Sequence, residues 1–285
     1  MGTPRYGHTA TPLPGGKVLL AGGWGAGGEY LASAELFDPA SGTFAPAADL
    51  PAARAGHVAV TLLDGRVLLV GGMGAGRTFL ATADLYDPAA GAFSSTGAMS
   101  VPRENHVAVR LADGRVLVAG GHSGRRPSVT VYDGAEIYDP AAGVFTATGS
   151  MGVRRHKHDA VLLPDGRVLV TGGSDERDGD GAYASAELYD AGAGTFSPAG
   201  AMSLPRYKHQ GTSAVLPDGR VLVAGGAARA EVYDPRTDTF ALVGGTARMA
   251  GQYSAVAPLD GGRVLVTGGY GEGHPPLPGT WIYRP

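Results

Sequence analysis

Short apolar stretches separated by glycine and aspartate turns run along the whole chain. The most regular of them reads DGRVLV-x-GG, or a near copy, and occurs six times. An apolar run of this length with turn residues on both sides is typical of a β-strand. The glycine doublets that end these runs recur about every 50 residues, a period that indicates a β-propeller with one repeat per blade. They begin at Gly22, Gly71, Gly120, Gly172, Gly225 and Gly268.

The second repeat predicts the four strands of one blade. Residues 57–63 are apolar and rich in β-branched side chains, and they predict strand a. An Asp-Gly pair follows, which is a two-residue hairpin signal and joins strand a to strand b at residues 66–70. Strand c is expected at residues 83–86, and strand d is expected to begin at Phe93 after a turn.

The same pattern divides the chain into six repeats and predicts one all-β domain over residues 1–285. The last repeat ends at strand c, so we expect its blade to have three strands. An uncovered edge strand is a pairing hazard, so we expect a segment outside this chain, or another chain, to cover it. The repeats are approximately residues 5–53, 54–102, 103–154, 155–205, 206–250 and 251–285.

Large aromatic residues recur in strands c and d, where we expect them to fill the space between neighbouring blades. Together with the glycine doublets, they resemble the kelch repeat, with phenylalanine in place of the usual strand d tryptophan. Residues 163–173 look most like bacterial kelch proteins and galactose-oxidase-like propellers. The resemblance implies an all-β, six-bladed kelch-type β-propeller. The aromatic positions are Phe37, Tyr86, Tyr138, Tyr189, Tyr233 and Tyr283 in strand c, and Phe44, Phe93, Phe145, Phe196 and Phe240 in strand d.

An Arg-x-x-His motif precedes strand a in the first five repeats, and we expect a structural role for it. Strand a side chains in a radial sheet face the neighbouring blades, so the arginines are expected to form ion pairs between blades with strand c carboxylates. The histidines are expected to bond the backbone of the next blade; a metal ring is the alternative. The structural residues are Arg5, Arg54, Arg103, Arg155, Arg206, His8, His57, His106 and His209, and the carboxylates are Glu35, Asp84, Glu136, Glu187 and Glu231.

Composition narrows the function classes. The formal net charge of −3 argues against a nucleic-acid partner. No apolar stretch has the length of a membrane span, and the N-terminus carries no signal-peptide pattern, so we expect no membrane partner and a cytoplasmic location if the chain is complete. The galactose-oxidase resemblance implies a copper site with a Tyr–Cys crosslink, which a chain without cysteine cannot form.

Function is expected where the repeats differ. The d–a and b–c loops share one face, and the a–b and c–d turns on the other face are short and uniform, so the loop face is the candidate binding surface. The expected ligand-binding residues are Tyr6, Trp24, Tyr30, Glu104, Asn105, His122, Arg125, Arg126, Lys208, Gln252, Tyr253 and Tyr270; Arg77, Tyr183 and His274 lie in the same loops. The acidic loop at residues 174–181 resembles a calcium loop but lacks the EF-hand spacing.

The sequence His156-Lys157-His158 is the sharpest departure from the repeat, because only there does a second histidine precede the repeated one. Alternation along an extended strand would place both histidines on one side, where they could share a metal or transfer protons. The candidate catalytic residues are His156, Lys157 and Tyr207, and the candidate metal ligands are His156, His158 and His122.

Three functions are compatible with this pattern. The first is a binding module for a peptide, protein or glycan at the loop face, with no cofactor. The second is an enzyme with an acid/base site at the channel mouth, working with or without a transition metal held by histidine. The third is a purely structural or designed scaffold. Fold alone does not choose among them.

Overall fold

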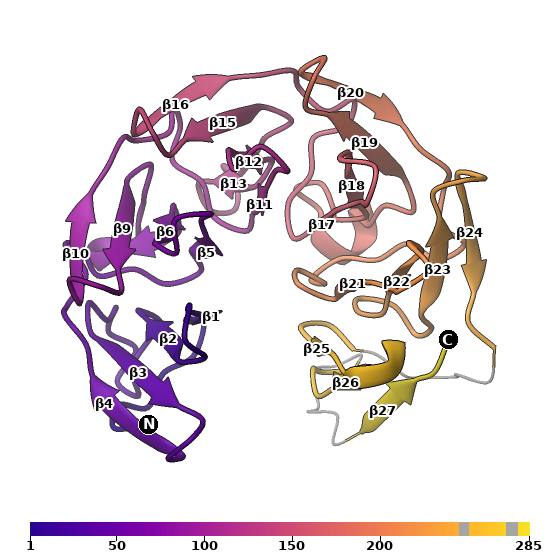
Figure 1. The fold of residues 1–285 in the computed structure, drawn as a ribbon. Helices are drawn as coiled ribbons and strands as arrows, with labels where there is room; N and C mark the ends of the chain where they lie inside the picture. Colours follow the sequence, from indigo (N-terminus) through magenta and orange to yellow (C-terminus); the bar gives the residue numbers. More distant parts are fainter. Residues whose placement is uncertain (245–250, 272–278) are drawn as a thin grey trace. The chain divides into compact units, whose positions relative to one another are not determined.

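The computed structural model describes residues 1–244, 251–271 and 279–285. It shows a six-bladed β-propeller in which five antiparallel sheets have four strands and the last has three. The predicted fold class, blade number and three-stranded last blade are therefore confirmed. The strands of each blade lie side by side in chain order in Figure 1.

The chain divides into two compact units. The first comprises Met1–Val118, His122–Thr130 and Glu136–Ala147, and the second comprises Ala119–Gly121, Val131–Ala135 and Thr148–Pro285. Blades 1 and 2 and most of blade 3 therefore belong to the first unit, and blades 4 to 6 belong to the second. The expectation of a single domain stays a prediction.

Blades 1 to 3 repeat one order of strands a, b, c and d. Blade 1 consists of β1 (Thr9–Pro12), β2 (Val18–Ala21), β3 (Ala34–Asp38) and β4 (Thr43–Pro46). Blade 2 consists of β5 (Val58–Thr61), β6 (Val67–Val70), β9 (Ala83–Asp87) and β10 (Ala92–Ser95). Blade 3 consists of β11 (Val107–Arg110), β12 (Val116–Ala119), β15 (Ala135–Asp139) and β16 (Val144–Ala147).

Blades 4 to 6 follow the same order. Blade 4 consists of β17 (Asp159–Leu162), β18 (Val168–Thr171), β19 (Ala186–Asp190) and β20 (Thr195–Pro198). Blade 5 consists of β21 (Ser213–Val215), β22 (Val221–Val223), β23 (Glu231–Asp234) and β24 (Thr239–Leu242). Blade 6 consists of β25 (Ala255–Pro258), β26 (Val264–Thr267) and β27 (Thr280–Tyr283).

Short elements occupy some of the connections. The b–c loop of blade 2 holds β7 (Met73–Gly74), η1 (Ala75–Arg77) and β8 (Thr78–Phe79), and that of blade 3 holds β13 (His122–Ser123) and β14 (Thr130–Val131). The 3-10 turn η2 (Asp178–Gly181) lies in the b–c loop of blade 4, and η3 (Asp260–Gly262) forms the a–b turn of blade 6. No helix within the described ranges has both the length and the apolar composition needed to cross a membrane.

The core lies between neighbouring blades. Strand b is mostly apolar, and all four residues of β6 have no exposed surface. Leu19 of blade 1 packs in one cluster with Leu69 and Tyr86 of blade 2, so burial of apolar surface holds the sheets face to face. The strand c tyrosine pairs across the sheet with the strand d phenylalanine, as Tyr86 does with Phe93, whose ring centroid lies 4.8 Å away. Phe44 departs from the predicted burial because 38% of its surface is exposed.

The predicted arginine–carboxylate pairs are present, but they form within a repeat and not between blades. The reason is that the segment before strand a crosses the end of its own sheet. Arg5 also donates to the carbonyl oxygen of Gly22 in its own glycine doublet at 2.8 Å. The pairs are Arg5–Glu35 at 3.1 Å, Arg103–Glu136 at 2.9 Å, Arg155–Glu187 at 2.7 Å, Arg206–Glu231 at 2.8 Å, and Arg54–Asp84.

The repeated histidines contact the preceding blade, and not the next blade as the sequence predicted. His57 Nε2 lies 3.0 Å from Thr9 Oγ1, and His209 Nε2 lies 3.2 Å from Thr171 Oγ1. These partners are side-chain hydroxyls, whereas His106 has a backbone partner, as expected, in Val70 of blade 2. His57, His106, His158 and His209 are all buried, so the motif contributes packed polar groups to the interface between blades.

Burial of these histidines predicts an acid-sensitive stability. Burial, with the charge of Arg103 second, lowers the pKa of His106 to about 3, and the pKa values of His57 and His209 fall in the same direction. An unfolded histidine has a pKa near 6.5, so below that pH the unfolded state binds more protons and stability is lost as pH falls. Each such histidine is expected to lower the free energy of unfolding by up to about 1.4 kcal/mol per pH unit below pH 6.5.

Urea unfolding at pH 7, 6 and 5 checks this expectation, because few carboxylates change their protonation in that interval. The variant His106→Gln should show a shallower loss than the parent protein, since it removes one titrating group. Equal stability at pH 7 and pH 5 would contradict the assignment of these histidines as buried and neutral.

Candidate functional site

The second variable residue of the Arg-x-x-His motif has left-handed backbone in the repeats. Its φ is 54° at Asn105 and Lys157, 55° at Lys208 and 54° at Tyr253, the equivalent position in blade 6. Such values are uncommon outside glycine, so the fold imposes them on whichever side chain stands there. In blades 1 and 2 the position is glycine, and this was the one signal in the sequence that pointed to the conformation.

Backbone hydrogen bonds join these positions between successive blades of one unit. The amide of Lys208 donates to the carbonyl of Lys157 at 2.8 Å, and the amide of Tyr253 donates to the carbonyl of Lys208 at 2.7 Å. Three side chains of the second unit are thus held in consecutive blades on one row of backbone. The sequence predicted each of them separately but not this row.

The first variable residue of the motif pairs with the residue after the glycine doublet of the same repeat. These antiparallel bridges bring together several residues that the sequence predicted only as neighbours on one face. They are Tyr6 with Trp24, Ala55 with Met73, Glu104 with His122, His156 with Ser174, and Gln252 with Tyr270. The d–a and b–c loops therefore form one surface within each of these five blades.

The candidate residues of blade 1 form an aromatic stack. The Tyr6 and Trp24 rings are stacked with centroids 5.3 Å apart, and the Trp24 and Tyr30 centroids are 5.7 Å apart. Tyr6 is 61% exposed. Trp24 also covers Gly7, where an added Cβ would lie 2.3 Å from its ring, so part of the stack serves as packing for the d–a segment.

The candidate residues of blades 2 and 3 in the first unit make mostly structural contacts. His122 Nε2 lies 4.0 Å from Glu104 Oε2, and the His122 ring meets the edge of Phe79 at 5.7 Å between centroids. Arg125 Nη2 lies 3.3 Å from Met73 Sδ. Arg125 and Arg126 are exposed in the b–c loop of blade 3, and Asn105 is half-buried beside Glu104.

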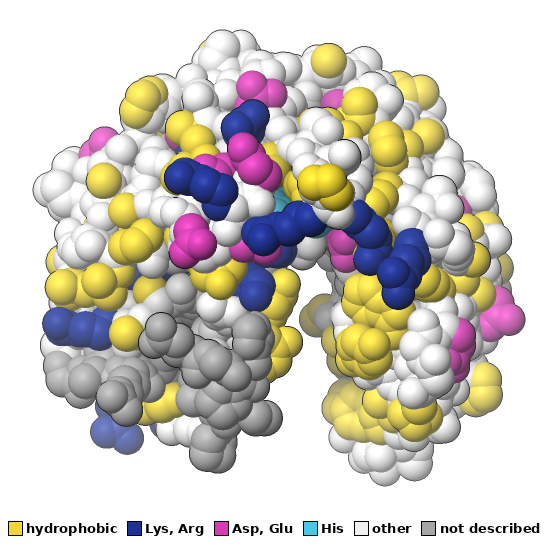
Figure 2. Space-filling view, turned by 180° about the vertical axis from the view of Figure 1, so that it is seen from behind, with side chains coloured by type: hydrophobic (Ala, Val, Ile, Leu, Met, Phe, Trp, Pro, Cys, Tyr) yellow, Lys and Arg dark blue, Asp and Glu magenta, His cyan; other side chains and the backbone are white. Residues whose placement is uncertain are grey.

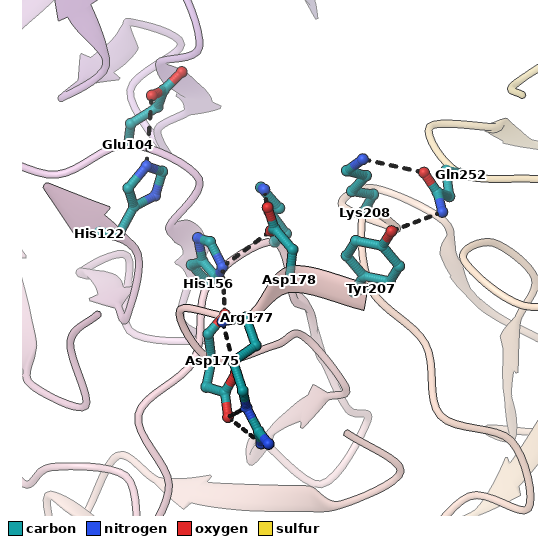
Figure 3. Close-up of polar contacts among 10 residues, drawn as sticks. Glu104, His122, His156, Asp175, Arg177, Asp178, Tyr207, Lys208 and Gln252 are labelled. Carbon is teal, nitrogen blue, oxygen red and sulfur yellow. Dashed lines mark hydrogen bonds and ion pairs between the residues drawn. The ribbon is translucent and has the colours of Figure 1, made fainter. Parts of the chain in front are cut away.

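His156 of the second unit is held by the acidic loop of its own blade. Its side chain is buried, and its Nε2 donates to the carbonyl oxygen of Asp175 at 3.1 Å and lies 3.5 Å from Asp178 Oδ1 (Figure 3). Burial, with the positive charge of Lys157 next, lowers the pKa of His156 to about 4, so its imidazole is neutral at neutral pH. The proposed acid/base role of His156, Lys157 and Tyr207 stays a prediction.

His156 and His158 of blade 4 do not lie on one side of an extended strand, contrary to the prediction from the sequence. Lys157 between them has a φ of 54°, so the segment is not extended there. His156 consequently contacts the acidic loop, whereas His158 lies under Gly120, where an added Cβ would be 2.6 Å from its ring. Among the described residues, no group of three or more His, Asp or Glu side chains is placed to hold a metal ion. His274 lies outside the described residues.

Two of the four carboxylates of the calcium-like loop, Asp175 and Asp178, are paired with different cations. Arg177 donates to both oxygens of Asp175, the shortest contact being 2.6 Å from Nη2 to Oδ2. Lys157 Nζ donates to Asp178 Oδ1. Because the two carboxylates have different cationic partners, they do not converge on one point as calcium ligands would.

Lys208 and its neighbours form the second cluster of the second unit. Lys208 Nζ lies 5.1 Å from the ring centroid of Tyr207 and 5.9 Å from that of Tyr253, within reach of cation–π attraction. Its ammonium donates to Gln252 Oε1 at 3.2 Å, and Gln252 Nε2 donates to the Tyr207 hydroxyl at 3.0 Å (Figure 3). Tyr253 meets the Tyr270 ring at 5.7 Å, so four of the predicted residues and Tyr207 are brought together.

The face drawn in Figure 2 carries both signs of charge. Asp and Glu side chains lie among Lys and Arg side chains in one part of it, and other Lys and Arg side chains lie together in a row.

Two shallow grooves lie on the opposite face, among the a–b turns. One of about 270 Å³ is lined by blades 2 and 3, with Leu63 exposed on it, and one of about 210 Å³ is lined by blades 5 and 6. In the first groove Arg66 pairs with Asp64 at 2.7 Å and Arg115 pairs with Asp113 at 2.7 Å. The charged groups of that groove are therefore already satisfied within their own turns.

Comparison with known proteins agrees with this architecture. Residues 4–51, the first repeat, match the kelch motif family. No sequence among curated proteins matches the chain. The matched repeat contains the Arg5–Glu35 pair and the glycine doublet at Gly22, and the same arrangement returns in blades 2 to 5. The chain is therefore a six-bladed β-propeller whose first repeat matches the kelch motif.

Proposed function

We propose that this chain is a non-catalytic binding module for a protein or peptide ligand, and that blades 4 to 6 of the second unit carry the contact surface. The fold supports a binding role, because loops on a rigid frame commonly carry recognition. In each of the first five repeats the buried arginine, its carboxylate and the neighbouring histidine are constant, while the two residues between arginine and histidine vary. A constant buried frame with variable residues only at the exposed face is typical of a protein that uses this face to bind a ligand.

The observation that carries the proposal is the setting of Lys208. Its ammonium has three donors, and its contacts are one hydrogen bond to Gln252 and the faces of two tyrosine rings. Within residues 1–244, 251–271 and 279–285, no carboxylate lies within ion-pair distance of it. A cation flanked by aromatic rings that are partly exposed suits a ligand with an acceptor group beside an apolar one.

Replacing Lys208 by alanine tests this function. A fluorescence-anisotropy screen of labelled peptides with varied charge and aromatic content is expected to find binders of the parent protein. Lys208→Ala is expected to weaken them about tenfold or more, as loss of a charged hydrogen bond at a contact site does. Lys17→Ala is the matched control, because Lys17 is an exposed lysine in the a–b turn of blade 1.

The results for the two variants distinguish a contact surface on blades 4 to 6 from a contact surface elsewhere on the protein. Lys17→Ala should bind as the parent protein does. Peptide binding that survives unchanged in Lys208→Ala would place the contact surface elsewhere and refute the assignment to blades 4 to 6. A parent protein that binds none of the peptides would refute the function itself.

A further inference from the structure

Asp178, in the b–c loop of blade 4, lies among cations of two blades. Lys157 Nζ donates to its Oδ1, and His156 Nε2 lies 3.5 Å from the same oxygen. Burial alone would raise the pKa of Asp178, but the hydrogen bond and charge of Lys157, with smaller effects of His156 and Lys208, hold that pKa below its usual range. The carboxylate is thus stabilised in its charged form by both lysines, with Lys157 in direct contact with it.

One carboxylate faces two lysines in this cluster. Burial lowers the pKa of Lys208, and so does the charge of Lys157, while Asp178 raises it. His156 is neutral at neutral pH, so the cluster of Lys157, Lys208 and Asp178 keeps one uncompensated positive charge. Such a charge favours a second anion, or an anion that contacts both ammonium groups at once.

The loop that carries Asp178 has other anchors. Asp175 is held by Arg177, and Ser174 forms bridges to both His156 and Ala182. The Asp178 side chain is 35% exposed, so water already reaches the carboxylate. Release of Asp178 from Lys157 would therefore break one partly solvated ion pair and leave the remaining contacts of the loop in place.

The b–c connection of blade 5 is much shorter than that of blade 4. It spans residues 224–230 between β22 and β23, whereas residues 172–185 join β18 to β19. In blade 4 the longer loop brings Asp178 to Lys157, the residue at the variable position of its own repeat. In blade 5 the side chain of Lys208, the equivalent residue, contacts Gln252 and the rings of two tyrosines, none of which belongs to the short loop. The difference in loop length thus explains why Lys157 pairs with a carboxylate whereas Lys208, among the described residues, does not.

We infer that Asp178 is an internal competitor in an anion-binding site formed by Lys157 and Lys208, and that the ligand of this face carries a carboxylate that displaces it. The inference rests on the proposed function and adds the chemistry of the ligand. A carboxylate fits because the internal occupant is itself a carboxylate on a short stem. The rings of Tyr207 and Tyr253 beside Lys208 would contact the apolar part of the same ligand.

The variant Asp178→Asn removes the competing charge while keeping the backbone. Asp178 has a φ of 62°, a conformation that asparagine tolerates as well as aspartate does, so the substitution adds no backbone strain. The probes are a fluorescein-labelled Glu-Gly repeat peptide and a matching Gln-Gly peptide. We expect Asp178→Asn to bind the Glu-Gly peptide about fivefold to tenfold more tightly than the parent protein, the effect of one partly exposed charge pair.

Two controls keep this expectation open to refutation. Lys208→Gln in the Asp178→Asn background should abolish the gain, and the Gln-Gly peptide should gain nothing. A gain of equal size for both peptides would mean that the variant only loosens the loop, which overturns the competitor role. If the peptide screen yields ligands but Asp178→Asn binds acidic ones no better than the parent protein, the inference fails while the binding function stands.

Discussion

Replacing Arg206 by alanine is expected to lower the free energy of unfolding by about 3–5 kcal/mol, the cost of leaving a buried charge without its partner. Neither Arg206 nor Glu231 has any exposed side-chain surface, and their charged atoms lie 2.8 Å apart. The same guanidinium donates to the carbonyl oxygens of Gly225 at 2.9 Å and Arg229 at 3.2 Å. The variant would lose these bonds together, and the carboxylate of Glu231 would keep only backbone donors. Urea unfolding followed by circular dichroism measures the change.

Arg236→Ala is the matched control in the same blade. Arg236 and Asp234 are joined at 2.7 Å, but 73% of the arginine side chain is exposed. Exposed pairs contribute little because water competes for both charges, so this variant should unfold like the parent protein. If Arg206→Ala and Arg236→Ala were equally stable, the buried Arg206–Glu231 pair would not contribute to the stability of the blade, which would contradict this prediction.

The repeated part of the molecule was predictable because every blade uses the same residues for the same contacts. The apolar run of strand b identifies β6, and the turn residues identify its ends to within one residue. The sixth repeat has Gly251 and Trp281 in place of the arginine and the carboxylate, and this joint loss agrees with their pairing in the other five blades. The blade that carries the carboxylate partner of each arginine was not predictable. A sequence repeat shows which residues are equivalent in different blades, but it does not show which blade each side chain faces.

The sequence predicted which residues lie in the loops of the variable face, but it did not predict how they are arranged there. The bridge between Gln252 and Tyr270 joins residues that the sequence placed in different loops of one face. The left-handed backbone at Lys157 and Lys208 was missed, because lysine gives no sign of a positive φ. The neutralisation of Lys157 by Asp178 was missed for a related reason, since loop length alone does not show where a side chain ends.

The frame and the variable face have separate energetic roles. The arginines of the frame are buried and form ion pairs with buried carboxylates, so changes there should act through stability and leave no specific effect on recognition. Lys208 is half-buried and interacts with neutral groups, so its replacement should act on binding with little change in unfolding. Measuring both quantities for each variant therefore distinguishes a structural effect from a recognition effect.

Gly71→Ala is expected to lower the free energy of unfolding by about 3 kcal/mol, combining left-handed strain with overpacking. Gly71 has a φ of 68°, and a Cβ there would lie 2.6 Å from the carbonyl oxygen of Arg103 and 2.7 Å from the His106 ring. Both groups belong to the next blade, and neither can retreat, because the Arg103 carbonyl accepts the amide of Gly72 at 2.9 Å.

Gly91→Ala separates the two causes. Gly91 has a similar φ of 65°, but nothing lies within 4 Å of the position where its Cβ would stand. It should therefore show only the backbone cost of about 1 kcal/mol. Thermal and urea unfolding of both variants measure the difference, which reports the close approach of blades 2 and 3 at the first glycine of the doublet. Equal losses in the two variants would show that backbone conformation alone selects glycine there, and that the contact between blades contributes nothing to its selection.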